Sequence, residues 1–119
     1  MGTGIILGAL NDKFIAQVPL TNGVSTATPP NVVVASGATG TGQFINGTYD
    51  LTGIDEDGYA YYDHRDFPGQ VTISYRITYN WWALRIDTTE YYRNLSTSKI
   101  VPKTNWTAQA GEGNLVLSF

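Results

Sequence analysis

The sequence predicts an all-β protein: a small antiparallel β-sandwich or partly closed barrel with an extended N-terminal arm. Apolar and polar residues alternate with a period of two over residues 71–79, which is the pattern of a strand with one buried face. Over residues 1–42, Gly and Pro recur every few positions and leave no room for long helices. No stretch of the chain has an apolar stripe at helical spacing.

Residues 1–42 are poor in large side chains, and Phe14 is their only aromatic residue. We predict that this segment is an arm that binds a partner protein or a capsid, because it has too few bulky residues to form a core alone. The residues expected to anchor the arm are apolar: Ile5, Ile6, Leu7, Phe14, Ile15 and Val18. A second interpretation is that a strand at 31–35 completes the chain's own domain. The Gly-rich residues 36–42 predict a flexible joint.

Residues 43–119 are rich in aromatic residues and predict the compact β-domain. The alternation over 71–79 places five residues on the inward face: Val71, Ile73, Tyr75, Ile77 and Tyr79. Asn80 and Trp81 then supply a reversal, since Asn tolerates a positive φ. A second alternating run over 82–87 turns three residues inward: Trp82, Leu84 and Ile86. We therefore predict a β-hairpin in this part of the chain.

Shorter segments predict further strands, at residues 42–45, 47–51, 59–62, 89–93 and 114–119. The first two of these flank Asn46-Gly47, which is a hairpin or bulge signal. In the last segment Leu115, Leu117 and Phe119 share one face, so we expect the C-terminal strand to be docked in a sheet with these three side chains inward. The whole domain is expected to contain roughly six to eight strands.

Composition excludes several classes of partner. The net charge of -3 and a pI near 4.8 argue against nucleic-acid binding, because phosphate contacts need clustered Lys and Arg and the seven basic residues are scattered singly. The absence of Cys excludes disulfides and thiolate metal sites. No apolar run approaches the roughly 20 residues that span a bilayer, so we predict no membrane partner. We also predict no cofactor, and the absence of a secretory signal pattern predicts synthesis in a cytoplasm.

Two polar clusters in the sequence are candidates for chemical sites. Asp63, His64 and Asp66 lie close together in the sequence, but adjacent residues of an extended chain face opposite sides, so we predict a loop of hydrogen-bonding caps and no catalytic residues. The protein is therefore expected not to be an enzyme. Residues 55–58, Asp-Glu-Asp-Gly, resemble the opening of a calcium loop, but the fifth, sixth and twelfth positions do not fit. An acidic turn is favoured there; a weak surface cation site is left open, and no metal is predicted.

The aromatic residues are divided between core and surface. Rings on the inward faces of the predicted strands belong to the core, namely Tyr75, Tyr79 and Trp82. Paired tyrosines in a strand turn one ring outward, and outward rings can stack on sugars or anchor a protein contact. The candidates for contact with a glycan are Tyr59, Tyr61, Trp81 and Tyr92.

One series of motifs resembles a known module. The motifs are Asn46-Gly47-Thr48-Tyr49, Tyr61-Tyr62, Ile77-x-Tyr79, Trp82-x-Leu84-x-Ile86, Tyr91-Tyr92 and Trp106-Thr107. Their order over residues 43–119 resembles a small aromatic-rich β-module of tailed-bacteriophage virion proteins. The chain departs from that module at Tyr79, where a Trp is usual, and in the loop 63–69. The resemblance implies an all-β fold and a place in a head decoration protein, a head fibre or a tail fibre.

The absence of fibre-shaft repeats and coiled-coil heptads favours the first of these roles. We therefore expect a structural virion protein, most closely a capsid decoration (accessory head) protein that attaches to the major capsid protein, or to another virion protein, through its N-terminal arm. It is expected to form homo-oligomers, to be made in the host cytoplasm and to lie on the capsid surface. The alternative is a carbohydrate-binding or receptor-binding module of a phage fibre, whose partner would be a host-surface glycan.

Overall fold

The computed structural model describes residues 28–119, and almost all of their regular structure is β. The elements in chain order are β1 (Val32–Thr39), the 3-10 helix η2 (Gly40–Ile45), β2 (Gly47–Ile54), β3 (Ala60–His64), β4 (Val71–Arg76), β5 (Trp81–Ile86), β6 (Thr89–Asn94), β7 (Thr107–Ala108) and β8 (Glu112–Ser118). The predicted all-β class is confirmed. Within residues 28–119, no helix has the length and apolar character needed to cross a membrane.

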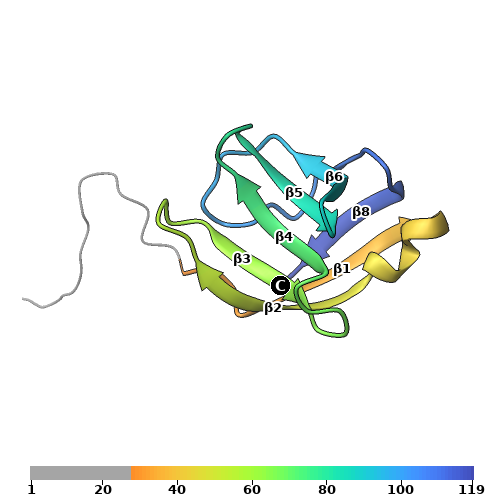
Figure 1. Cartoon of the computed structure of the whole chain (residues 1–119), viewed down its shortest axis with the longest axis horizontal. Helices are drawn as coiled ribbons and strands as arrows, with labels where there is room; N and C mark the ends of the chain where they lie inside the picture. The colour runs from red at the N-terminus through yellow and green to blue at the C-terminus, as the bar shows by residue number, and fades with distance from the viewer. Residues whose placement is uncertain (1–27) are drawn as a thin grey trace, which may run out of the picture.

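The eight strands form one antiparallel sheet in the order β7-β6-β5-β4-β3-β2-β1-β8. The strands from β1 to β7 follow one another as a meander, and β8 returns to pair with β1. The sheet curls on itself (Figure 1), and its two edge strands, β7 and β8, come into contact. The result is a nearly closed barrel, one of the two architectures that the sequence predicts.

The interior of the barrel is filled largely by aromatic rings. The four largest side chains that are completely buried are Trp82, Tyr49, Tyr62 and Tyr92. Their polar atoms have backbone partners, as buried polar groups require. The indole Nε1 of Trp82 donates to the carbonyl oxygen of Ser98 at 3.0 Å, and the hydroxyl of Tyr62 donates to the carbonyl oxygen of Pro30 at 2.8 Å. Buried side chains on the strands therefore hold the backbone of the connecting loops in place through hydrogen bonds.

The structure corrects the predicted domain boundary at residue 42. Strand β1 lies between β2 and β8 and buries Val33, Ala35 and Ala38, and η2 buries Ile45. The segment 36–42, predicted as a joint, instead continues the strand and forms the first half of η2. The strand interpretation of residues 31–35 is therefore confirmed, and an arm ending at 42 is wrong. The predicted arm anchors, from Ile5 to Val18, lie outside the described residues.

The predicted β-hairpin is confirmed as β4 and β5, with Asn80 at a positive φ of 63° in the turn. The first strand is shorter than predicted, because it ends at Arg76. The amides of Tyr79 and Asn80 both donate to the carbonyl oxygen of Arg76, at 3.0 and 2.8 Å, and this turn carries the chain out of the sheet. As a result Ile77 and Tyr79 are 54% and 50% exposed, and their predicted place in the core is wrong.

The remaining strand predictions hold with small shifts. Residues 59–62, 89–93 and 114–119 correspond to β3, β6 and β8, and Leu115 and Leu117 are buried as expected. Phe119 follows the end of β8 and is 46% exposed, so its predicted inward position is wrong.

The Asn46-Gly47 pair joins η2 to β2 and does not form a hairpin turn. The side-chain amide of Asn46 bonds the backbone of Ala38, accepting from its N–H at 3.0 Å and donating to its carbonyl oxygen at 2.8 Å. This pair of bonds fixes the path of the chain from β1 through η2 to β2. Segment 42–45, predicted as a strand, is helical because it must turn the chain over this end of the barrel.

We expect a chain that begins at residue 28 to fold, and a chain that begins at residue 43 not to fold. The longer chain retains every described element, whereas the shorter one lacks β1 and leaves one edge of β2 and one edge of β8 unpaired. Thermal unfolding followed by near-ultraviolet circular dichroism separates the two outcomes. The same cooperative transition in both chains would show that β1 does not hold the barrel together.

Stability should fall in alkaline solution. Burial raises the pKa of Tyr62 to about 12, and burial also raises the pKa of Tyr49. An unfolded tyrosine ionises near pH 10, so between about pH 10 and 12 only the unfolded chain releases the proton. The contribution of Tyr62 is thus complete below pH 10 and is lost as the pH rises through 12.

The variant Tyr62→Phe provides the control for this pH dependence. It should unfold at a lower denaturant concentration at neutral pH, but it should lose ~2 kcal/mol less stability than the wild type between pH 8 and 12. Denaturant titrations at several pH values measure both effects. Parallel pH profiles for the two proteins would contradict the assignment.

Candidate functional site

Three of the four arginines of the chain lie on the outer face of β4, β5 and β6: Arg76, Arg85 and Arg93. Alternation along the hairpin turns Arg76 and Arg85 outward. A β-bulge at Tyr91 then shifts β6 by one residue, because Leu84 pairs with Tyr92 whereas Arg85 pairs with Glu90. The bulge brings Glu90 and Arg93 onto one face, although residues three apart would otherwise face opposite sides. We give the name arginine cluster to five residues: Arg76, Trp81, Arg85, Glu90 and Arg93.

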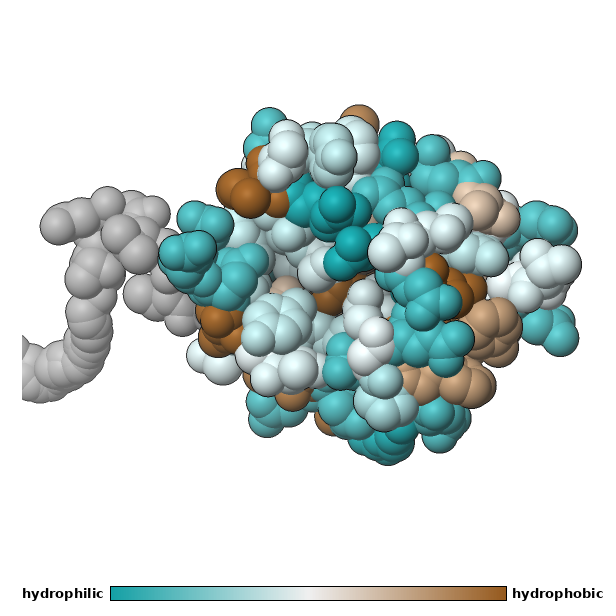
Figure 2. Space-filling model, in the orientation of Figure 1, coloured by the Kyte–Doolittle hydropathy of each residue, from teal (hydrophilic) through white to brown (hydrophobic). Residues whose placement is uncertain are grey.

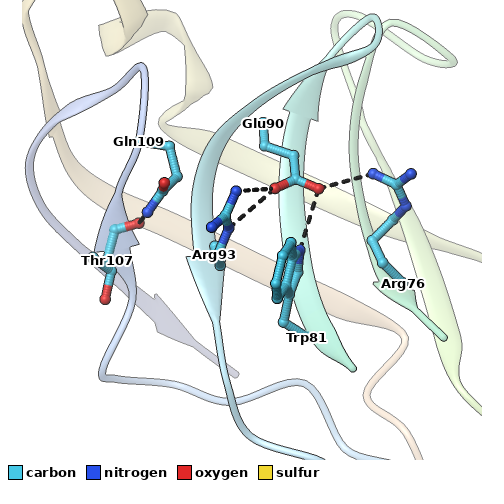
Figure 3. Close-up of polar contacts among 6 residues, drawn as sticks. All are labelled: Arg76, Trp81, Glu90, Arg93, Thr107 and Gln109. Atoms are coloured by element: carbon cyan, nitrogen blue, oxygen red, sulfur yellow. Dashed lines mark hydrogen bonds and ion pairs between the residues drawn. The ribbon is translucent and has the colours of Figure 1, made fainter. Parts of the chain in front are cut away.

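The carboxylate of Glu90 is the centre of the arginine cluster (Figure 3). Its Oε1 accepts from Nε and Nη2 of Arg93, at 3.1 and 2.9 Å. Its Oε2 accepts from Nη1 of Arg76 at 2.9 Å and from the indole Nε1 of Trp81 at 3.2 Å. The Glu90 side chain is only 13% exposed, so these four bonds form largely out of water, where charged hydrogen bonds are strong.

Trp81 is held on both faces of its ring. On one face the ring of Tyr79 stacks at 5.0 Å between centroids, with 14° between the planes. Against the ring also lies the guanidinium of Arg93, whose Cζ is 4.0 Å from the centroid. Neither face of the indole is free for a ligand, and the exposed ring of the stacked pair is that of Tyr79, with Cζ of Arg76 at 5.1 Å from its centroid. Trp81 therefore helps to hold the ring of Tyr79 and the guanidinium of Arg93 in place.

Arg85 is the unsatisfied member of the arginine cluster. Its Nε is buried and has no hydrogen-bond partner among the described residues. Burial lowers the pKa of the Arg85 guanidinium, the nearby charge of Arg76 lowers it further, and Glu90 opposes the change. A buried donor without a partner costs about 1–3 kcal/mol. Two guanidinium groups thus bond the one carboxylate and the third lies near it without a hydrogen bond, so the face carries an excess of positive charge although the whole chain has a net charge of -3.

Uncharged polar side chains flank the arginine cluster on two sides. On β7, Thr107 pairs with Arg93, and Gln109 follows it and donates to the carbonyl oxygen of Thr107 at 3.5 Å (Figure 3). On β4, Thr72 and Ser74 alternate with the inward residues and pair with the second strand of the hairpin. The face therefore presents hydroxyl and amide groups beside its charges.

The structure places the four predicted glycan contacts in different environments. Tyr59 and Tyr92 are buried, so the exposure predicted for them is wrong, and Tyr91 is the partly exposed member of its pair. Tyr61 and Trp81 do face outward, on β3 and β5. Tyr61 is 38% exposed, whereas Trp81 is covered on both faces as described above.

His64 is a structural residue. Its ring is buried, with Nε2 donating to the carbonyl oxygen of Asn46 at 3.1 Å and Nδ1 accepting from the amide of Asp66 at 3.1 Å. Both ring nitrogens are therefore engaged by backbone, and a Cβ on Gly47 would meet the ring at 2.9 Å. Asp63 lies on the other side of β3, as predicted from the alternation of an extended chain.

The acidic turn 55–58 is organised by its own backbone. The Oδ1 atom of Asp55 accepts from the amides of Asp57 and Tyr59, at 2.9 and 3.0 Å, and Gly58 adopts a positive φ of 88°. These contacts are those of a capped turn. Over residues 28–119 no three His, Asp or Glu side chains are grouped as metal ligands.

The basic residues are scattered along the sequence, but three of them gather in the arginine cluster, so the expectation that they are not clustered is wrong. The alternation in the hairpin does place Arg76 and Arg85 on one outer face, so this part of the signal is present in the sequence. The position of Glu90 and Arg93 depends on the bulge at Tyr91, which no local pattern marks. No family model, curated protein or solved structure matches the chain.

Replacing Glu90 with glutamine should lower the free energy of unfolding by about 2–3 kcal/mol. The substitution removes the only carboxylate of the arginine cluster and leaves three guanidinium groups facing one another. The loss should be larger at low ionic strength, because salt screens their repulsion. Glu56→Gln, in an exposed turn, is the matched control and should change stability by less than about 0.5 kcal/mol. Equal losses in the two variants at all salt concentrations would contradict the central role of Glu90.

Proposed function

We propose that this chain is a non-catalytic structural protein that attaches to a neighbouring protein of a larger assembly through one rim of its barrel. The motifs of the chain also resemble those of bacteriophage virion modules. Together, the attachment through one rim and this resemblance favour the role of a capsid decoration protein that binds the major capsid protein. The observation that carries the proposal is a ring of exposed apolar side chains at that rim.

The ring follows from the topology. Strands β2, β4, β6 and β8 all run in the same direction, so they end at the same rim. Each ends at, or is directly followed by, an exposed apolar residue: Ile54, Ile77, Leu95 and Phe119. We call these residues the apolar rim. Alternate strands of a sheet are about 10 Å apart, so the apolar rim forms a series of evenly spaced contacts.

Exposed apolar residues at one end of a barrel favour contact with protein. Leu95 is 72% exposed, and Tyr79, also at this rim, adds a half-exposed ring. Hydrophobic side chains are visible among hydrophilic ones at the end of the barrel where the described chain begins (Figure 2). Aromatic and aliphatic side chains surrounded by polar groups are common in the centres of protein interfaces. An arm formed by the first residues of the chain would join the barrel at this same rim, since β1 starts there.

A non-catalytic role is supported by the state of the polar side chains that chemistry would need. Both nitrogens of His64 are bound by backbone, and the carboxylates of Asp55 and Glu90 accept two and four hydrogen bonds. Each of these groups already makes hydrogen bonds within the protein. This favours a role in stability and not in a reaction with a substrate.

A second candidate function is saccharide binding, as in a receptor-binding module of a phage fibre. It is favoured by the outward rings of Tyr61 and Tyr79, since exposed aromatic rings can stack on the apolar faces of sugars. Tyr61 lies on β3, and Tyr79 stacks on Trp81 of β5. This candidate and the structural role do not exclude each other, because the four residues of the apolar rim are not part of the saccharide surface and only Tyr79 borders both.

The double variant Ile77→Ser/Leu95→Ser should weaken self-association of the full chain by about tenfold or more, because a truncated apolar anchor costs about 1–2 kcal/mol of binding free energy. Sedimentation velocity over a range of protein concentrations measures this. Val34→Ser/Val116→Ser is the matched control, since these valines are exposed on the wall formed by β1 and β8. The Ile77→Ser/Leu95→Ser variant should also bind virus particles more weakly than the wild type. The Val34→Ser/Val116→Ser control should bind them as well as the wild type.

Two results would contradict the proposal. One is that the wild type and the Ile77→Ser/Leu95→Ser variant are both monomeric and that neither binds virus particles. The other is loss of association only in the Val34→Ser/Val116→Ser control, which would move the interface from the rim to the wall of the barrel.

A further inference from the structure

The arginine cluster contains donors that Glu90 does not use. Arg76 reaches Glu90 with Nη1 alone, and Arg85 makes no hydrogen bond to any residue in the range 28–119. Both guanidinium groups are partly exposed, and Arg85 is close enough to Arg76 for their charges to interact. Like charges held together on a folded surface favour an anion that neutralises them.

The geometry of the cluster selects the kind of anion. Glu90 already occupies one carboxylate position, where two N–H groups of Arg93 converge on its Oε1. Planar guanidinium groups on the same face offer a second carboxylate the same two-pronged contact. Two of the three arginines are held in place before any ligand arrives, because Glu90 bonds both Arg76 and Arg93 and the ring of Trp81 packs against Arg93. A rigid site loses little entropy on binding.

The surroundings of the cluster favour a sugar as the carrier of this carboxylate. The half-exposed ring of Tyr79 provides an apolar surface next to Arg76. The uncharged side chains of Thr72, Ser74 and Gln109 lie on the same outer face and can bond hydroxyl groups. Aromatic, hydroxyl-binding and carboxylate-binding groups are thus combined on one wall of the barrel.

We infer that the outer face of β4, β5 and β6 is a binding site for an acidic saccharide, whose carboxylate lies between Arg76 and Arg85 and whose ring contacts Tyr79. The inference rests on the saccharide-binding candidate and adds to it the class of sugar. It also assigns a role to Arg85, whose guanidinium makes no hydrogen bond to the described residues.

Isothermal titration calorimetry with trigalacturonic acid tests the site, with its methyl ester as a neutral ligand of nearly the same shape. The acid should bind to the full chain at low ionic strength, and the methyl ester should bind at least about tenfold more weakly. Arg85→Gln should weaken binding of the acid by a similar factor. Because Arg85 makes no hydrogen bond to the described residues, this variant should keep the wild-type unfolding temperature or exceed it. Arg65→Gln, which removes an exposed pair with Asp50 elsewhere on the barrel, should leave binding unchanged.

Four results would overturn the inference, and they can be told apart. Equal binding of the acid and the ester would leave saccharide binding in place but reject the carboxylate site. Binding of inorganic sulfate as tight as that of trigalacturonic acid would reduce the site to one for simple anions. Tighter binding of a polyglutamate peptide would replace the sugar by an acidic protein. No binding of any acidic or neutral sugar would reject the saccharide-binding candidate as well, without affecting the apolar rim.

Discussion

The pairing of β1 with β8 is the contact on which the rest of the structure depends. It joins the first described strand to the last and turns a seven-stranded meander into a nearly closed barrel. The two strands approach closely at Gly37 and Gly113, which both have a positive φ, and a Cβ on Gly37 would clash with the carbonyl oxygen of Asn114. Only glycine allows this approach, so the Gly-rich segment after the Val run has a structural purpose.

Closure of the barrel creates both surfaces that concern function. It brings the ends of β2, β4, β6 and β8 to a common rim, where four exposed apolar residues gather from distant parts of the sequence. It also curves the sheet so that β4, β5 and β6 lie side by side in one convex wall (Figure 1). The rim is apolar and the wall is cationic and aromatic, so the two surfaces suit different partners.

Local patterns predicted the part of the fold in which neighbouring residues decide the outcome. Alternation identified the hairpin of β4 and β5, with Trp82 and Leu84 inside, because each inward side chain gains burial independently of the remote chain. The same rule failed at Tyr79, where two backbone amides bond the carbonyl oxygen of Arg76 and end the strand. The flexible joint predicted at 36–42 from its glycines was also wrong, because these small residues pair with β8, more than 70 positions later.

The sequence by itself determined the all-β class, most of the strands and the absence of thiol chemistry, since these depend on periodicity and composition. Only the tertiary structure decided that β1 belongs to the barrel and that Arg76, Arg85 and Arg93 meet around Glu90. The physical reason is that strand register and bulges are set by long-range pairing, in which one residue of shift moves a side chain to the opposite face. Such shifts leave the composition of a segment unchanged, so they are visible only when the paired strands are known.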